Sequence, residues 1–319
     1  MGTGGGKRAS QEMPARPPDR CRLPRFESPN EASPRFEVDD GAALEYLRQH
    51  GYVVIAAALT AEEVREAVGL FWDYVEQSSK GVVRRGCPET WAGEAWDGSS
   101  QNGLFEQGGV GQSAFLWYVR LRPKVLEAFR RVWGLAGPED LIMSFDGCCA
   151  FRPTGYDASW RTLGGWYHTD QNARITGTDL VCVQGFVSLL DQDEKTGGLA
   201  VLPGSHLRHG ELFGGWADRS HRRDFCILPK EDPLLVGPKR IPARLVRARA
   251  GDLVLWDSRC VHCNVPAWHR FDEEPFSAAL SEAGLADVDE PFLQNCSSMA
   301  DAAWYWHNVV SEQRGIVEP

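Results

Sequence analysis

GDLVLWDSRCVHCN, residues 251–264, is a strongly apolar run that closes with one histidine, His262, between two cysteines. Three runs of similar character precede it, at residues 141–153, 180–193 and 198–206. Each run is short, and Gly, Pro or Asp turns separate it from the next. Short strands at this spacing are typical of an antiparallel β-sandwich or barrel. The sequence therefore predicts a β core over about residues 141–266.

The sequence before this core is typical of helices. ALEYLRQHGYVVI, residues 43–55, predicts a short amphipathic helix that stops at Gly51 and a strand from Tyr52 to Ile55. Thr60 and Glu63 then have the spacing of a capping box, with apolar residues at helical intervals after them. A further helix is expected over about residues 113–133. Helices followed by strands predict an α+β, mainly β fold: a β-barrel core with N-terminal helices packed on one sheet.

The two ends of the chain differ from this core. Residues 1–35 are rich in Gly, Pro, Arg and Ser, which predicts a disordered leader. Residues 36–319 are expected to form a single domain. Its last part, residues 267–319, is atypical, because it reads as loop and helix where barrel-closing strands are expected.

Composition narrows the class of protein. The 319 residues are 43% hydrophobic, enough for a substantial core, and the net charge of −10 argues against a general nucleic-acid binder. We expect neither a transmembrane helix nor a signal peptide, so the cytoplasm is the default compartment. Nine cysteines, an odd number, do not suggest a disulfide framework. Cys260 and Cys263 flank His262 as a zinc half-site would, or are simply buried small apolar groups.

A second stretch, GGWYHTDQ at residues 164–171, carries a candidate site. His168 and Asp170 are two apart, so in a strand both side chains lie on one face. Two explanations stay open at this point: a hydrogen-bonded polar corner, or a metal site. Of the eight histidines, His262 is the one that closes a strongly apolar strand, whereas His206 and His209 follow a turn and are expected to be exposed. Two histidines and one carboxylate on one face of a metal are typical of non-haem Fe(II) oxygenases.

Three motifs occur in a specific order around these residues. They are His168-Thr169-Asp170-Gln171, Gln184-Gly185 and Trp256-Asp257-Ser258-Arg259. In these motifs, and in its opening LRQHGYVVIAAALTAEEV, the chain resembles the phytanoyl-CoA dioxygenase family of Fe(II)/2-oxoglutarate oxygenases. The resemblance covers about residues 42–266. It implies a double-stranded β-helix, or jelly-roll, fold.

The resemblance also implies a chemistry. His168, Asp170 and His262 match the catalytic metal ligands of the family, with Fe(II) as the metal and 2-oxoglutarate and O2 as co-substrates. The implied reaction is the oxidative decarboxylation of 2-oxoglutarate to succinate, coupled to oxidation of a small-molecule substrate. Related halogenases have a small residue in place of the carboxylate, so Asp170 favours hydroxylation. No nucleic-acid or membrane partner is expected, and neither the substrate nor the oligomeric state can be read from the sequence.

The co-substrate residues follow less directly. The family normally has an Arg or Lys beyond the second histidine to bind the distal carboxylate of 2-oxoglutarate, for which a guanidinium is well suited. Arg270 is the nearest candidate and Arg259 the second, although each has the alternative of a solvated surface position. Gln171 and Gln184 are candidates for lining the pocket, or are satisfied by the backbone.

Several alternatives therefore remain. One is a non-catalytic jelly-roll protein that binds metal but has lost 2-oxoglutarate binding, and another is a cupin-like enzyme with a different metal. The tryptophans, including Trp160, Trp166 and Trp256, either shape an aromatic substrate pocket or belong to the core. The basic run at residues 208–223 either recognises an anionic substrate or is a solvated loop.

Overall fold

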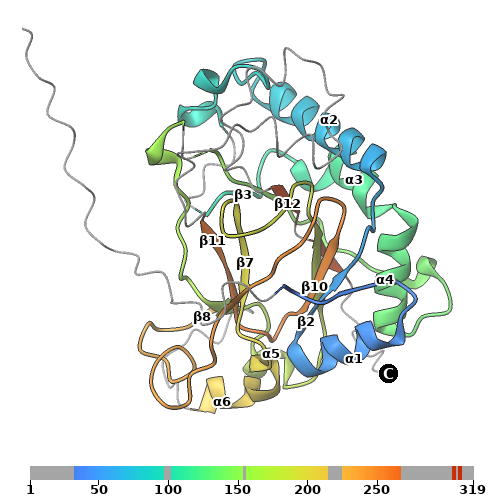
Figure 1. The fold of residues 1–319 in the computed structure, drawn as a ribbon, viewed down its shortest axis with the longest axis vertical. Coiled ribbons are helices and arrows are strands. Elements are labelled where there is room, and N and C mark those ends of the chain that lie inside the picture. The colour runs from blue at the N-terminus through green and yellow to red at the C-terminus, as the bar shows by residue number, and fades with distance from the viewer. Residues whose placement is uncertain are drawn as a thin grey trace, which may run out of the picture.

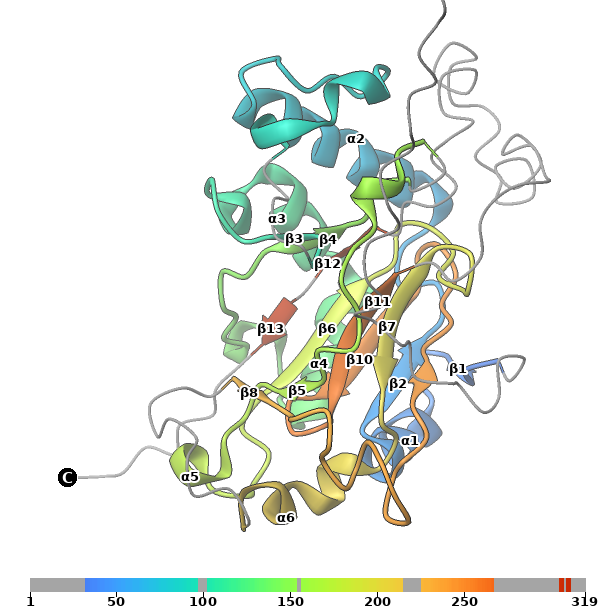
Figure 2. The ribbon, with the colours of Figure 1, turned by 90° about the vertical axis from the view of Figure 1, so that its left-hand side faces the viewer.

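Two five-stranded sheets lie at the centre of the molecule (Figures 1 and 2). This computed structural model describes residues 32–96, 102–153, 156–214, 225–266, 304–306 and 308–310. The first sheet, here the β10 sheet, has the order β1 (Arg35–Phe36), β2 (Tyr52–Ile55), β10 (Leu253–Asp257), β6 (Val183–Val187), β13 (Asn308–Val310). The second, the β11 sheet, has the order β8 (Cys226–Ile227), β5 (His168–Thr169), β11 (His262–Pro266), β7 (Gly197–Val201), β9 (Arg244–Leu245).

A smaller sheet and several helices complete the described fold. The third sheet has the order β12 (Trp304–Trp306), β4 (Cys148–Ala150), β3 (Leu104–Phe105). The α-helices are α1 (Gly41–His50), α2 (Ala61–Ser78), α3 (Ala114–Arg120), α4 (Pro123–Trp133), α5 (Ala173–Thr176) and α6 (His209–Gly214). Short 3-10 turns occur at Pro88–Thr90, Gly93–Ala95, Val110–Gln112, Pro138–Asp140, Ala158–Trp160 and Ser205–Arg208. The β1–β2 pair is parallel, and the other described strand pairs are antiparallel.

The helices cover one face of the β10 sheet. Gly185 of β6 is paired with Leu255 of β10, and a Cβ atom placed on Gly185 would lie 3.0 Å from the ring of Phe129 in α4. The alternate positions, Gln184 and Trp256, therefore lie on the opposite face, which is turned toward the β11 sheet. This arrangement confirms the expected α+β, mainly β fold with N-terminal helices on one sheet.

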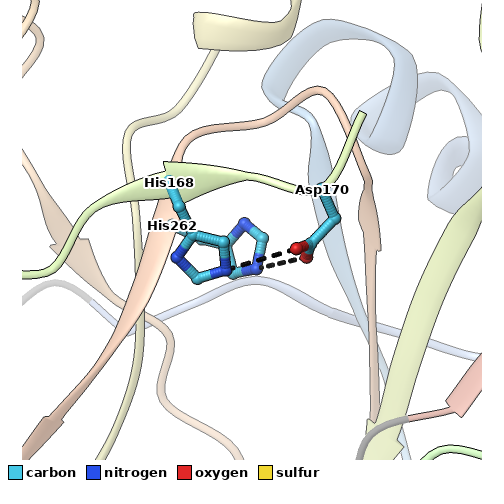
Figure 3. A group of neighbouring side chains, drawn as sticks. All are labelled: His168, Asp170 and His262. Atoms are coloured by element: carbon cyan, nitrogen blue, oxygen red, sulfur yellow. Dashed lines mark ion pairs between the residues drawn. The ribbon is translucent and has the colours of Figure 1, made fainter. Parts of the chain in front are cut away.

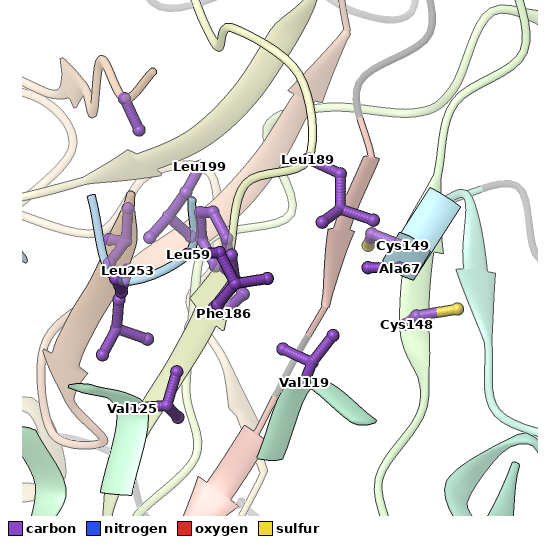
Figure 4. Close-up of a cluster of buried hydrophobic side chains, with 14 of the residues drawn as sticks. Leu59, Ala67, Val119, Val125, Cys148, Cys149, Phe186, Leu189, Leu199 and Leu253 are labelled. Atoms are coloured by element: carbon purple, nitrogen blue, oxygen red, sulfur yellow. The ribbon is translucent and has the colours of Figure 1, made fainter. Parts of the chain in front are cut away.

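Two apolar clusters lie on opposite faces of the β11 sheet. The larger one fills the space between the sheets and continues under the helices; Figure 4 shows part of it, with Phe186 and Leu199 among its members. The smaller one packs on the outer face and includes Tyr167, Cys226, Leu228, Val261, Cys263 and Val265. Cys260 and Cys263 are both fully buried, and the one metal-competent cluster among the described residues contains no cysteine. This finding favours the other reading, in which the two cysteines are buried small apolar groups.

The predicted N-terminal elements are confirmed, with one correction. Gly51 ends α1 with φ +78°, and Thr60 and Glu63 form the expected capping box at the start of α2. The helix predicted over residues 113–133 is instead two helices, α3 and α4. Pro123 is the first residue of α4. Proline has no backbone N–H to donate, which costs nothing in the first turn, where the N–H groups have no partner within the helix. Inside a continuous helix the same proline would remove a hydrogen bond.

The C-terminal segment also differs from the prediction. Residues 304–306 and 308–310 form β12 and β13, which pair with β4 and β6. The sequence AAWYWHNVV suggested a helix because its apolar residues are closely spaced, but aromatic and β-branched residues favour strands. These strands extend two sheets, so the expectation that residues 267–319 lack closing strands is wrong for this part.

The N-terminal leader lies mostly outside the described residues. Of the stretch 1–35, only residues 32–35 are described; there Ser33 is buried and Arg35 begins β1. The helices of the described residues include none with the length and apolar character needed to cross a membrane.

Candidate metal centre

Strand register brings three predicted residues together. His262 of β11 is directly paired with His168 of β5, so both imidazoles lie on one face of the sheet. Asp170 follows β5, and its backbone nitrogen donates a hydrogen bond of 3.0 Å to the carbonyl of Ser258, the first residue after β10. One possible ligand atom of each of these three residues lies within 4.8 Å of the others (Figure 3).

Backbone carbonyls fix the orientation of both imidazoles. Nδ1 of His168 lies 3.1 Å from the carbonyl oxygen of Trp166, and Nδ1 of His262 lies 2.9 Å from that of Cys260. A carbonyl oxygen only accepts hydrogen bonds, so each Nδ1 carries the proton and each Nε2 keeps its lone pair. These Nε2 atoms lie 3.5 Å and 3.2 Å from the two carboxylate oxygens of Asp170.

The centre has the donor set and spacing that a cation needs. Nε2 of His262 is buried, and the described residues offer it no hydrogen-bond partner, because its approach to Asp170 lacks hydrogen-bond geometry. Two imidazole lone pairs face a carboxylate, so the site is rich in electrons. Ligand bonds of about 2.1 Å separate neighbouring ligand atoms by about 3 Å, which is close to the distances seen here. The residues present therefore fit a divalent metal.

Electrostatics favour the ligand forms of His168 and Asp170. Burial, together with the neighbouring His262, lowers the pKa of His168, so its imidazole is neutral near pH 7. Burial alone would raise the pKa of Asp170, but attraction of the carboxylate to the facing His168 and His262 side chains, when these carry a proton, holds it well below its ordinary value. About a quarter of the Asp170 side chain is exposed, whereas both imidazoles are almost fully buried. The open direction of the site is therefore on the Asp170 side.

Aromatic rings surround the two histidines. The ring of Trp166 is stacked on that of His168, with 4.6 Å between the ring centroids and an interplanar angle of 5°. The centroid of the Phe225 ring also lies 4.6 Å from that of the same imidazole. Trp256 comes from the β10 sheet and lies 5.3 Å from His262. Trp160 is instead stacked on Trp91 in the core. Of the three tryptophans considered in the sequence, two therefore lie at the centre.

The two candidate glutamines have different environments. Gln171 is fully engaged: its oxygen accepts from Ser258 Oγ and Val181 N, and its nitrogen donates to the carbonyl of Asp179. Gln184 is also buried, but its Oε1 has no partner among the described residues. Because Gln184 is paired with Trp256, its side chain lies on the face of the β10 sheet that is turned to the histidines.

Of the two candidate arginines, the structure describes only Arg259. Arg259 forms a bidentate ion pair with Asp257, with contacts of 2.9 Å and 2.6 Å, and donates a third bond to the carbonyl of Thr178. Its guanidinium is therefore engaged within the turn between β10 and β11. Arg270 lies outside the described residues.

Two histidines expected to be exposed are buried instead. Nε2 of His206 bonds the carbonyl of Arg48 at 2.9 Å, and Nε2 of His209 bonds that of Gln171 at 2.6 Å. A further buried side chain, Asn264, was missed: it is two residues beyond His262 on the same strand face and donates to Cys149 Sγ at 3.0 Å. The period of two in β11 was the signal that could have identified it.

Comparisons with known proteins agree with this geometry. The family model described as phytanoyl-CoA dioxygenase (PhyH) matches residues 47–263. "Ava biosynthesis cluster protein O" of Aspergillus versicolor is 28% identical over 223 residues, which cover 67% of this chain and 68% of that protein. "Putative phytanoyl-CoA dioxygenase" of Dictyostelium discoideum is 27% identical over 251 residues, 68% of each chain.

A solved structure supports the fold. The non-heme alpha ketoglutarate dependent carbocyclase SnoK from nogalamycin biosynthesis aligns with a TM-score of 0.51 and 18% identity, covering 87% of this chain and 86% of that chain. At this identity the likeness shows the fold alone. Together with the two facing, mainly antiparallel sheets it confirms the jelly-roll arrangement, although the sheets stay separate and no closed barrel forms among the described strands.

Proposed function

The chain belongs to the phytanoyl-CoA dioxygenase family, and from this premise we propose that it is an Fe(II)- and 2-oxoglutarate-dependent dioxygenase that hydroxylates a small molecule. One observation supports the proposal above all: the Nε2 lone pairs of two buried imidazoles face one carboxylate. Two histidines and a carboxylate on one face leave the opposite coordination positions open, as this chemistry requires.

The proposed reaction balances with two co-substrates. A substrate R–H, O2 and 2-oxoglutarate give R–OH, succinate and CO2, so that one oxygen atom enters the product and the other enters succinate. Bound Fe(II) would supply the activation of O2 and the chelation of the 2-oxoacid group. Since Asp170 provides a carboxylate where halogenases have a small residue, we assign hydroxylation and not halogenation to the site.

The chain's own residues have separate tasks in this proposal. His168, Asp170 and His262 hold the metal, and the carbonyls of Trp166 and Cys260 keep both imidazoles in the tautomer that ligates. Trp256 excludes water from the inner side of His262. Gln184 offers a buried amide oxygen toward the reactants.

The residue that binds the distal carboxylate of 2-oxoglutarate is Arg270 in this proposal, because Arg259 is committed to Asp257. We further propose that residues 36–319 act as one oxygenase domain behind a leader of residues 1–35. The substrate is a small molecule.

Anaerobic titration tests the function. Fe(II) is added to the full chain, followed by 2-oxoglutarate, and the weak visible charge-transfer band of the chelate is recorded. We expect the band in the native protein and in a His50→Ala control, whose imidazole lies at the end of α1. The band should be absent from His168→Ala. Succinate formation after admission of O2 provides the second readout.

The same titration separates the alternative. A non-catalytic member that has lost co-substrate binding would bind Fe(II) tightly but form no band, and 2-oxoglutarate would not raise its melting temperature. Binding of another metal without any response to 2-oxoglutarate would instead favour a cupin-like enzyme. Either outcome would overturn the proposed dioxygenase.

A further inference from the structure

Strand β8 breaks the usual burial pattern of the β11 sheet. Side chains in β8 and next to it alternate between the two faces of the sheet. Cys226 and Leu228 are buried in the outer apolar cluster, whereas Phe225 and Ile227 are 42% and 51% exposed. In a sandwich the face turned to the other sheet is normally the buried one. On β8 the apolar side chains that point inward are the exposed ones.

Register places these inward residues beside the metal centre. Ile227 is paired with His168, and His168 is paired with His262, so the three side chains lie in one row on the same face. Farther along the row, Val201 is fully buried in the inner cluster. Burial therefore decreases across the sheet, from the buried Val201 of β7, past the two imidazoles, to the exposed Ile227 of the edge strand β8.

The open edge carries an apolar surface that touches a proposed metal ligand. We define the β8 rim as Trp166, Phe225 and Ile227. Two of its rings lie 4.6 Å from the His168 imidazole, and the third member is the direct strand partner of that residue. A molecule that covers the rim is therefore within reach of a metal held by His168. Phe225 and Ile227 are exposed, whereas Trp166 is half-buried. Exposed apolar side chains that lie together indicate a contact surface.

Resting on the proposed function, we infer that the β8 rim is the substrate-binding surface and that the substrate is an uncharged, ring-bearing apolar molecule. All three rim side chains are uncharged, and two are aromatic. Flat rings pack on exposed aromatic faces in offset-stacked or edge-on arrangements. The phosphates of an acyl-CoA or of another anionic substrate gain no counter-charge from these residues, and burial without one is costly.

Ligand titration of the loaded protein tests this inference. The full chain with Fe(II) and 2-oxoglutarate is kept anaerobic, and flavone and estrone are compared with octanoyl-CoA as probes. We expect at least one uncharged ring compound to shift the charge-transfer band and raise the melting temperature, and octanoyl-CoA at the same concentration to do neither. The probes serve as members of the class, so turnover is not required.

Two variants place the binding on the rim. Ile227→Thr keeps the β-branched shape but removes apolar surface, and Phe225→Leu removes a ring. Each substitution should lower the affinity for the ring compound about fivefold. The matched control is Val236→Thr. Val236 is 47% exposed, and it lies beside Leu234 and Leu235, which pack with the cluster on the other face of the sheet. The Val236→Thr protein should bind the probe as tightly as the native protein does.

Failure of the inference is distinguishable from failure of the function. If the native protein forms no band, the dioxygenase proposal fails and this inference fails with it. If the band forms but only octanoyl-CoA shifts it, or neither ring compound does, the substrate class is overturned. A loss of several degrees in melting temperature for unliganded Ile227→Thr, against none for Val236→Thr, would show that another part of the chain covers the rim, and would overturn its role.

Discussion

His168 and His262 are direct partners across β5 and β11, and the centroids of their rings lie 4.2 Å apart. The pairing, and not a local sequence motif, creates the site, since a one-residue shift of either strand would turn its imidazole into the outer apolar cluster. Val261 and Cys263, on either side of His262, are buried in that outer cluster and oppose such a shift.

Removal of the carboxylate should abolish metal-dependent activity. In Asp170→Ala the two imidazoles remain, but the negative charge that balances a divalent cation is lost. Loss of a residue that only orients a metal ligand lowers metal affinity by up to about 100-fold. Asp170 is a proposed ligand itself, so we expect the affinity for Fe(II) to fall by more than this and succinate formation to stop. Isothermal titration with Fe(II) and a succinate assay measure both. Exposed Asp140→Ala is the control, and native-like turnover in Asp170→Ala would contradict the proposed site.

Trp166 should act as a positioning residue for His168. Its ring is stacked on the imidazole, while its backbone carbonyl fixes Nδ1. Trp166→Leu keeps the backbone carbonyl but leaves the imidazole of His168 free to rotate. We therefore expect the affinity for Co(II), measured without substrate, to fall about tenfold. Trp166→Phe should recover most of it. Trp117→Leu, a half-buried tryptophan in α3, should not change Co(II) binding, and equal Co(II) affinity in both leucine variants would show that the stack is only structural.

The two candidate arginines should respond oppositely. Arg259→Ala leaves the carboxylate of Asp257, whose side chain is 6% exposed, without its bidentate partner. Loss of one partner of a buried pair costs about 3 kcal/mol of stability, which urea unfolding would detect. For Arg270→Ala we expect unchanged stability and a raised KM for 2-oxoglutarate. A raised KM in a stable Arg259→Ala protein would instead assign the co-substrate to Arg259.

Patterns of regular period made much of this fold predictable. The strand Tyr52–Ile55, the capping box at Thr60 and the strand run after residue 141 each carry a local signal that tertiary packing did not override. The triad followed from the same logic, because a period of two places His168 and Asp170 on one face. His262 could be added because it closes a continuous apolar strand.

The remaining features depend on contacts distant in sequence or on segments too short to show a period. Strand β8 has two residues, so its alternation became visible only beside β5. The pairing of Arg259 with Asp257 depends on how the turn after β10 folds, which charge spacing does not reveal. His206 looked exposed beside glycine and serine, yet a backbone carbonyl of α1 binds it in the folded chain.

One ion pair away from the site should make stability depend on pH. Hydrogen bonds from the Arg85 side chain lower the pKa of Glu76, against the opposing effect of burial. The folded pKa lies below the unfolded value of about 4.3, so the pair stabilises the fold above that pH and is lost as pH falls through the folded pKa. The difference in urea midpoint between the native protein and Glu76→Gln should therefore shrink from about pH 6 to below about pH 4. A constant difference would show that the charge of Glu76 contributes nothing.

Gln184 and Gln171 offer a matched pair for separating function from stability. Both are buried, but Gln171 satisfies Ser258, Val181 and Asp179, whereas Oε1 of Gln184 has no partner among the described residues. Gln171→Leu leaves those groups unsatisfied and should lower the free energy of unfolding by about 2–4 kcal/mol. Gln184→Leu removes a polar atom that lacks a partner, so its stability should be unchanged or slightly higher.

The activities should show the reverse order. If Gln184 contacts the bound reactants, Gln184→Leu should raise the KM for 2-oxoglutarate or for substrate about tenfold, since one hydrogen bond to a charged or buried group contributes about 1.5 kcal/mol. Gln171→Leu, assayed below its melting temperature, should keep both constants near native values. Unfolding curves and initial rates on the same samples test both halves. A Gln184→Leu protein with native kinetics would assign this amide to the fold alone.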